Sequence, residues 1–369
     1  MRRVGLFAAL ALAVMVVLAG CASEYETPSL EDMAMIGVIG YDYSGDKNVQ
    51  VSVSIPVPSS RSKEMTQTYS TVATVTSEAI LKLSSMAERT MSLSQLRVVL
   101  FSEEYARKVG LGKVLMDLYR NPIVGENVFV AIVKGRAEDV VRGNYQHKPE
   151  LNTYLNDLLR PRVETAFSSF TTIKDYIFMT TSGVCDPNMP YLVKHTEDIF
   201  VDKAALFRGD KMIDTMTQRE GKLVQAVIGR KRLPRMSFEL PADGKKEQIV
   251  LDFVWSKGRV RSKGSLEKPE LHINLEYRVT LVGYTGTKRL DNDGEMETLK
   301  KQLEGQFKKE ALATLKRFQK AGIDPAQLEE SFRRQYRGKW SRDIGLKLYQ
   351  KAGIDVHVGL EIVGFGTLD

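Results

Sequence analysis

Cys21 is the residue of this sequence whose surroundings point most directly to a chemical modification. Residues 18–21 read Leu-Ala-Gly-Cys, which fills all four positions of a lipobox. In that motif the cysteine sulfur is acylated, the chain is cut before it, and the cysteine becomes the new N-terminus. We therefore expect residues 1–20 to be removed as a signal peptide and Cys21 to be the lipidation site.

The segment before the lipobox has the layout of an export signal. Arg2 and Arg3 supply positive charge, and residues 4–18 form an almost uninterrupted apolar run. This run is too short to cross a bilayer comfortably, whereas two acyl chains on Cys21 would anchor the chain stably. A plain secretory signal with a coincidental cysteine and an uncleaved membrane anchor are the alternatives. The lipobox interpretation predicts a folded body tethered to the outer face of a membrane.

No other set of residues has the spacing of a known catalytic or metal site. The sequence lacks a Gly-x-Ser-x-Gly elbow, a Walker loop and a dinucleotide fingerprint. Adjacent carboxylates at 103–104 and 329–330 fall in helical patterns, where we expect surface charges. No zinc-ligand spacing occurs among the four histidines, which are His147, His195, His272 and His357. We expect no catalytic residue, no metal and no cofactor, and hence a protein that is not an enzyme.

Three further features have structural explanations. Once Cys21 carries lipid, Cys185 is the only free thiol, so no intramolecular disulfide can form and we expect a structural role for it. Gly110-Leu111-Gly112-Lys113 lacks the rest of a phosphate-binding loop and predicts a helix interruption. Asp291-Asn292-Asp293-Gly294 lacks the twelfth-position glutamate of a calcium loop and predicts a helix cap.

Composition is that of a folded body of ordinary polarity, with 43% hydrophobic and 27% charged residues. The 349 residues that follow the first 20 suffice for two or three domains. Loss of Arg2 and Arg3 lowers the formal charge from +7 to +5, which suits a body near anionic lipid. We favour an ordinary solvated surface over any specific basic site as the explanation of this charge. The basic run at 230–235 is expected to be a solvated loop, and export excludes a nucleic-acid partner.

The first half of the mature chain predicts a mixed β-sheet with helices packed on it. Apolar and alternating patterns predict strands at 33–41 and 49–57, which a turn at 43–46 joins into a hairpin. A helix from Ser77, a strand at 96–101, a helix capped by Ser102 and a strand at 128–133 follow. This order of strands and helices is typical of a mixed sheet.

A second pattern starts near Asp198. We expect a hairpin at 204–213, a helix at 218–227, and strands at 248–255 and 272–282. A long helix at 295–320 and a helix that starts at Asp324-Pro325 should follow. The chain should close on a strand at 356–365 beside the strand of Ile273. The fold class is therefore α+β, a multi-domain chain of mixed β-sheets with flanking helices after an N-terminal lipoprotein signal peptide. The expected boundaries are a tether at 21–29, an N-terminal domain at 30–190, and a C-terminal domain at 197–369 with a hinge at 257–268.

Several segments, in their order and spacing, resemble the Ger(x)C family of spore germination lipoproteins. They are LEDMAMIGVIGYD at 30–42, SQLRVVLFSEEYA at 94–106, RNP at 120–122, AIVKG at 131–135, AALFRGDK at 204–211, and FRRQY at 332–336 with Trp340. The chain departs from the family at Ala22-Ser23, where Trp-Asp is frequent, and at 219–222, which lacks the usual aromatic residues. These departures put any shared partner contact at those two points in doubt.

The resemblance implies the C subunit of a nutrient germinant receptor, built from several β-sheets with flanking helices and without a cofactor. Such a subunit would work with two integral membrane receptor subunits at the spore inner membrane. Lipid on Cys21 would hold it on the outer face, where it would dock on its partners and support transmission of the nutrient signal without catalysis.

Two other classes compete with this interpretation. A solute-binding lipoprotein of a membrane transporter needs two similar α/β lobes around a cleft, whereas the two halves here differ in pattern. A lipid-anchored hydrolase needs a convergent polar site, and the sequence offers no such set of residues.

Overall fold

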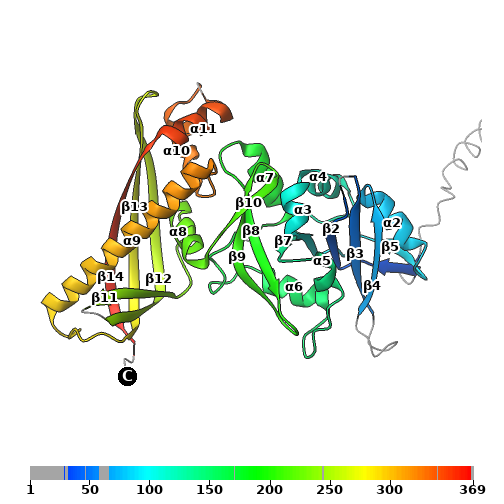
Figure 1. Ribbon diagram of the computed structural model, residues 1–369, viewed down its shortest axis with the longest axis horizontal. Helices are drawn as coiled ribbons and strands as arrows, with labels where there is room; N and C mark the ends of the chain where they lie inside the picture. The colour runs from blue at the N-terminus through cyan, green and yellow to red at the C-terminus, as the bar shows by residue number, and fades with distance from the viewer. Residues whose placement is uncertain are drawn as a thin grey trace, which may run out of the picture.

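The computed structural model describes residues 29, 32–45, 47–57, 66–169, 171–242, 245–338 and 340–366. Cys21 and the signal peptide lie outside these residues. The molecule is elongated and has two parts, each built on its own β-sheet with flanking helices (Figure 1). The predicted α+β fold with mixed sheets is confirmed.

The first part is organised around an eight-stranded sheet of order β10-β9-β8-β7-β6-β2-β3-β4. Its centre, from β8 to β2, is parallel, and both flanks are antiparallel. The predicted hairpins β2–β3 and β9–β10 are both present. The strands are β2 (Val38–Tyr43), β3 (Val49–Pro56), β4 (Thr66–Ala73), β6 (Val98–Ser102), β7 (Phe129–Val133), β8 (Asn188–Lys194), β9 (Ile199–Arg208) and β10 (Lys211–Met216).

Helices cover both faces of this sheet, which explains why the central strand β6 is buried along its whole length. One face packs against α2 (Thr76–Ser84), α3 (Glu103–Lys108), α4 (Gly112–Arg120) and α7 (Ile173–Ser182). The other packs against α5 (Ala137–Val141) and α6 (Leu151–Leu159). Beside α2, the short strands β1 (Met33–Met35) and β5 (Thr90–Ser92) form a parallel pair.

The chain breaks between α3 and α4 as the glycines predict. The Ser102 hydroxyl caps α3 by accepting from the backbone N–H of Tyr105 at 3.2 Å. Gly110 then takes a positive φ of 96°, and the N–H of Leu111 donates to the carbonyl of Asp210 at 3.0 Å. This loop therefore fastens the helices to the β9–β10 hairpin.

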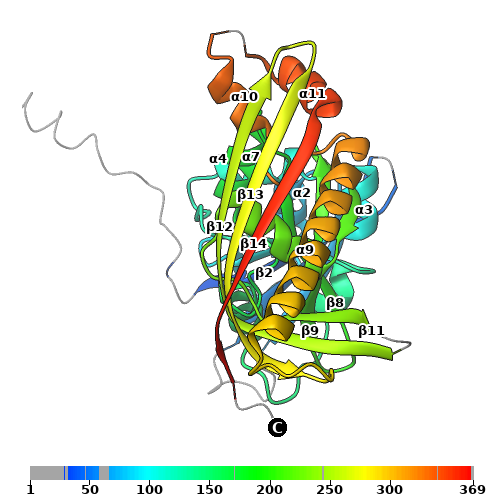
Figure 2. The same ribbon diagram turned by 90° about the vertical axis from the view of Figure 1, so that its left-hand side faces the viewer.

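The second part has a four-stranded sheet of order β11-β12-β13-β14, in which β14 pairs parallel to β13. Val356 lies opposite Ile273, as predicted. The strands are β11 (Met236–Ala242), β12 (Lys245–Gly264), β13 (Pro269–Tyr284) and β14 (Gly353–Phe365). Helix α9 (Asp293–Ala321) lies along this sheet (Figure 2) and buries the predicted stripe of Leu299, Leu303, Phe307, Ala311, Leu315 and Phe318. The Asn292 side chain caps it.

The segment 257–268, where glycine and proline predict a hinge, is instead paired β-hairpin. Strand β12 runs to Gly264 and pairs there with Pro269 at the start of β13. Gly264 supplies the positive φ of the turn, 80°. At Gly258 a Cβ would lie 2.1 Å from the carbonyl oxygen of Ala226, so this glycine admits a closely packed helix. In this structure Gly258 permits close packing and Gly264 forms the turn.

Helix α8 (Gln218–Ile228) joins the two parts by packing on both β9 and β12 (Figure 1). Ala204, Leu206 and Met216 of the first sheet share the apolar core of the second part. The remaining helices α10 (Glu329–Gln335) and α11 (Arg342–Lys351) lie at one end of the second sheet. The two parts therefore have a continuous apolar core between them.

A pair of helical glycines tests this packing. At Gly221 in α8 a Cβ would lie 2.0 Å from the carbonyl oxygen of Phe167, whereas at Gly305 in α9 nothing lies within 4 Å. We expect Gly221→Ala to lower the free energy of unfolding by about 1–3 kcal/mol through overpacking. Gly305→Ala should raise it by up to about 1 kcal/mol through helix propensity. Thermal midpoints measure both changes, and an unchanged midpoint for Gly221→Ala would contradict the packing of α8 described here.

Candidate functional site at the junction of the two parts

Three carboxylates from both parts of the molecule meet at the junction. Asp186 lies in the loop before β8, Asp324 follows α9, and Glu329 begins α10, with exposures of 6%, 0% and 5%. The N–H of Asp324 donates to Oδ2 of Asp186 at 2.9 Å, and the N–H of Asp186 donates to the carbonyl of Asp324 at 3.2 Å. The N–H of Glu329 donates to Oδ2 of Asp324 at 2.7 Å. Asp324 thus ties the second part to the first.

Cations reach this cluster only from its edge. The guanidinium of Arg342 lies 3.4 Å from Oδ1 of Asp186, and that of Arg208 donates to the carbonyl of Ala321. A third cation, Arg317 of α9, pairs with Asp214 in β10 and Glu220 in α8. The junction therefore combines a buried acidic centre with partly exposed ion pairs around it.

Burial changes the protonation of the acidic centre. It is the largest of the effects that together raise the pKa of Asp324 to about 7 and that of Glu329 to about 8, and the charges of neighbouring carboxylates act in the same direction. Burial also raises the pKa of Asp186. The backbone N–H groups of Asp324 and Gly209 and the charge of Arg342 lower this pKa, but by less. The hydroxyl of Tyr349 and Oδ1 of Asp324 are buried without a partner among the described residues. Near neutral pH the cluster therefore holds protons that ordinary carboxylates release.

The structure corrects two expectations here. The helix predicted to start at Asp324-Pro325 begins at Glu329, because the Asp324 carboxylate is turned inward to accept from the Glu329 N–H. Glu329, expected to be a surface charge, is buried, whereas Glu330 pairs with Arg333 and Arg334 as expected. The sequence contained one signal for this later helix start. Asp324 lies five positions before Glu329, with Pro325 between them.

The other candidate residues from the sequence have structural contacts of their own and, among the described residues, form no catalytic arrangement with this cluster. Cys185 is 6% exposed, and burial raises the pKa of its thiol to about 11, which suits a structural role. Glu103 accepts from the Tyr191 hydroxyl at 2.6 Å and pairs with Arg107, and Glu104 pairs with Lys108. Over the part of the chain that the structure describes, no three His, Cys, Asp or Glu side chains are grouped to hold a metal ion.

Comparison with known families covers nearly the whole chain. The family model for the "Spore germination protein N-terminal domain" matches residues 27–194, and that for "Spore germination B3/ GerAC like, C-terminal" matches residues 202–366. The chain belongs to the Ger(x)C family of spore germination proteins. Asp186 lies in the first of the two matched regions, and Asp324, Glu329 and Arg342 lie in the second. The carboxylate cluster therefore joins the two family domains.

Individual relatives agree with this assignment. The chain is 24% identical to the Bacillus cereus spore germination protein GerQC over 97% of this chain and 98% of that protein. It also resembles the crystal structure of the GerBC protein, with a TM-score of 0.57 and 14% identity, over 88% of this chain and 96% of that one. The second likeness concerns the fold alone. None of the helices among the described residues has the length and apolar character needed to span a bilayer.

The raised carboxylate pKa values predict how stability depends on pH. In the unfolded chain Asp and Glu have pKa values near 3.8 and 4.5, so the folded state holds protons that the unfolded chain has already released. The free energy of unfolding should therefore fall as pH rises from about 5 to 8, by up to about 1.4 kcal/mol per unit for each such proton. Glu329→Gln should flatten this decline in thermal midpoints measured from pH 5 to 9.

Glu330→Gln is the matched control for this experiment. The guanidinium of Arg333 lowers the pKa of Glu330, so this group stays ionised across the measured range and its replacement should leave the slope unchanged. Equal slopes for Glu329→Gln and the unaltered chain would contradict the raised pKa of Glu329.

Proposed function

We propose that this protein is the lipid-anchored C subunit of a nutrient germinant receptor, which docks on two integral membrane subunits at the outer face of the spore inner membrane and transmits the nutrient signal without catalysis. The observation that carries the proposal is the match of both spore germination domains along a chain that has a complete lipobox at 18–21. Its similarity to GerQC along almost the full length of both chains supports the same role.

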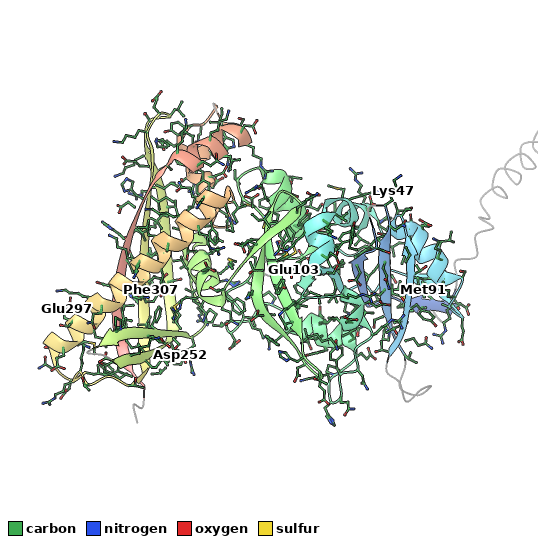
Figure 3. All side chains as sticks on the ribbon, in the orientation of Figure 1. Lys47, Met91, Glu103, Asp252, Glu297 and Phe307 are labelled. Atoms are coloured by element: carbon green, nitrogen blue, oxygen red, sulfur yellow. The ribbon has the colours of Figure 1, made fainter. Side chains whose placement is uncertain are left out.

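The position of the anchor relative to the fold supports a specific orientation. Twelve residue steps separate Cys21 from Met33 in β1, and an extended chain of that length spans at most about 42 Å. Strand β1 pairs with β5, and Met91 of β5 lies near the end of the molecule opposite Glu297 of α9 (Figure 3). An acylated Cys21 would therefore keep the β1–β5 end at the membrane and direct the second part away from it.

The surface of that end fits a position close to lipid. Leu81 on α2 and Met86 in the turn after it are 73% and 59% exposed. Lys82 on the same helix pairs with Glu78 and donates to the carbonyl of Val72. Apolar side chains beside a cation suit the interface between water and a bilayer.

Transmission of a signal through this subunit requires that its two parts respond together. The shared apolar core around α8 and the buried Asp186–Asp324 contacts support such coupling. A partner that displaces one part would displace the other, since separating them exposes both the core and the carboxylates to water.

Affinity purification from detergent-solubilised spore membranes tests the proposed function. We expect the unaltered chain to retain two polytopic membrane proteins, identified by mass spectrometry, and Cys21→Ala to lose most of both because it is not held at the membrane. Cys185→Ala is the matched control, since it removes the buried thiol and leaves the lipobox intact, and it should retain both partners. Recovery of a transporter alone would reject the receptor role and favour the solute-binding alternative.

A further inference from the structure

The second part contains a cavity of about 300 Å³ that the proposed function does not use. It lies between α8, α9, β11 and β13, and Phe307, which lines it, marks its place in Figure 3. Its inner wall is apolar and includes Leu223, Met236, Phe238 and Phe307. An apolar cavity of about 150 Å³ suffices to bind benzene, so this one is large enough for a ring with a short substituent.

Aromatic side chains give this cavity a defined shape. The ring of Phe307 has its centroid 4.6 Å from that of Phe238 and 4.7 Å from that of Tyr277. The guanidinium of Arg219 lies 5.0 Å from the centroid of Phe238 and holds that ring in place from outside. The wall can therefore receive a flat apolar group without rearranging first.

Tyr277 lines the cavity with its ring and has an unsatisfied, buried hydroxyl. Its side chain is 2% exposed, and the hydroxyl has no hydrogen-bond partner within the described ranges. An unpaired buried hydroxyl costs about 1–3 kcal/mol, and buried polar groups without a partner are rare. Tyr277 therefore contributes its ring to the lining, while its hydroxyl is closed off from the cavity in this structure.

Four charged side chains line the cavity, and three of them, Arg219, Glu220 and Glu310, are in ion pairs. Glu220 already pairs with Arg317, and Glu310 with Arg219. Lys222 is half-buried and donates to the carbonyl of Arg235 at 2.6 Å, and no carboxylate in the described part of the chain pairs with it. Burial and the nearby charge of Arg219 lower the pKa of Lys222. Among the described residues, Lys222 is therefore the charged side chain of the lining that has no ion-pair partner, and its charge is positive.

We propose that this cavity binds a small apolar or aromatic monocarboxylic acid. The carboxylate lies at Lys222, and the apolar body packs against Phe238 and Phe307. This inference goes beyond the receptor role, because binding requires neither the lipid on Cys21 nor a membrane partner.

Isothermal titration of the full-length protein in detergent, with 3-phenylpropanoate as the probe and a detergent blank, tests the site. We expect one molecule to bind per chain with a Kd below about 1 mM, which corresponds to about −4 kcal/mol. The neutral analogue 3-phenylpropanol should bind at least tenfold more weakly, because it lacks the charge that Lys222 requires. Lys222→Gln should weaken the binding of 3-phenylpropanoate by a similar factor.

Substitutions on α9 separate binding in the cavity from binding elsewhere. Ala313 is exposed at the rim, so Ala313→Phe should block the opening without disturbing the core and weaken binding at least tenfold. Gln302→Phe adds the same ring at an exposed position of the same helix outside the cavity and should leave binding unchanged. Thermal midpoints establish that each variant is folded. The absence of binding at 5 mM probe, equal effects of the two phenylalanines, or equal binding of the neutral analogue would each overturn the proposal.

Discussion

The exchange of hydrogen bonds between Asp186 and Asp324 is the contact on which the arrangement of this molecule depends. Each residue donates its backbone N–H to an oxygen of the other, and both side chains are removed from water. Asp324 also accepts from the first N–H of α10, so the orientation of that helix follows from the same carboxylate. Because an unpaired buried carboxylate is costly, the two family domains are held in one relative position.

With the two parts held in one arrangement, the proposed lipid anchor would give the two ends of the molecule different surroundings. The β1–β5 end is the one that a lipid on Cys21 would hold near the membrane, and the second sheet with α9 would extend away from it. The aromatic cavity beneath α9 lies in that second part, and α8, which supplies four of its lining residues (Arg219, Glu220, Lys222 and Leu223), also contacts β9 of the first sheet. A ligand in the cavity would thus contact the helix that connects the two parts.

Local patterns in the sequence were sufficient to predict most helices and strands, but not the contacts at the junction of the two parts. The alternation in β3 and β13, the stripe of α9 and the cap at Ser102 are set by residues close in sequence, so they could be predicted. Glu329 bonds to Asp324, which in turn bonds to Asp186, a residue 143 positions before Glu329 in the chain. Gly258 suggested a hinge because the sequence does not show that Ala226, from a distant helix, packs closely against it. The cavity was missed for the same reason, since four separate elements form it.

A distance measurement between the two parts tests the central claim that the buried carboxylates hold them in one arrangement. Spin labels at Lys174→Cys in α7 and Lys309→Cys in α9, both exposed positions, report this distance when the two native cysteines are replaced by alanine. The account predicts one narrow distance distribution at pH 6 and a broader one at pH 9, where the carboxylates lose their protons. A distribution that is broad at pH 6, or equally narrow at both values, would contradict it.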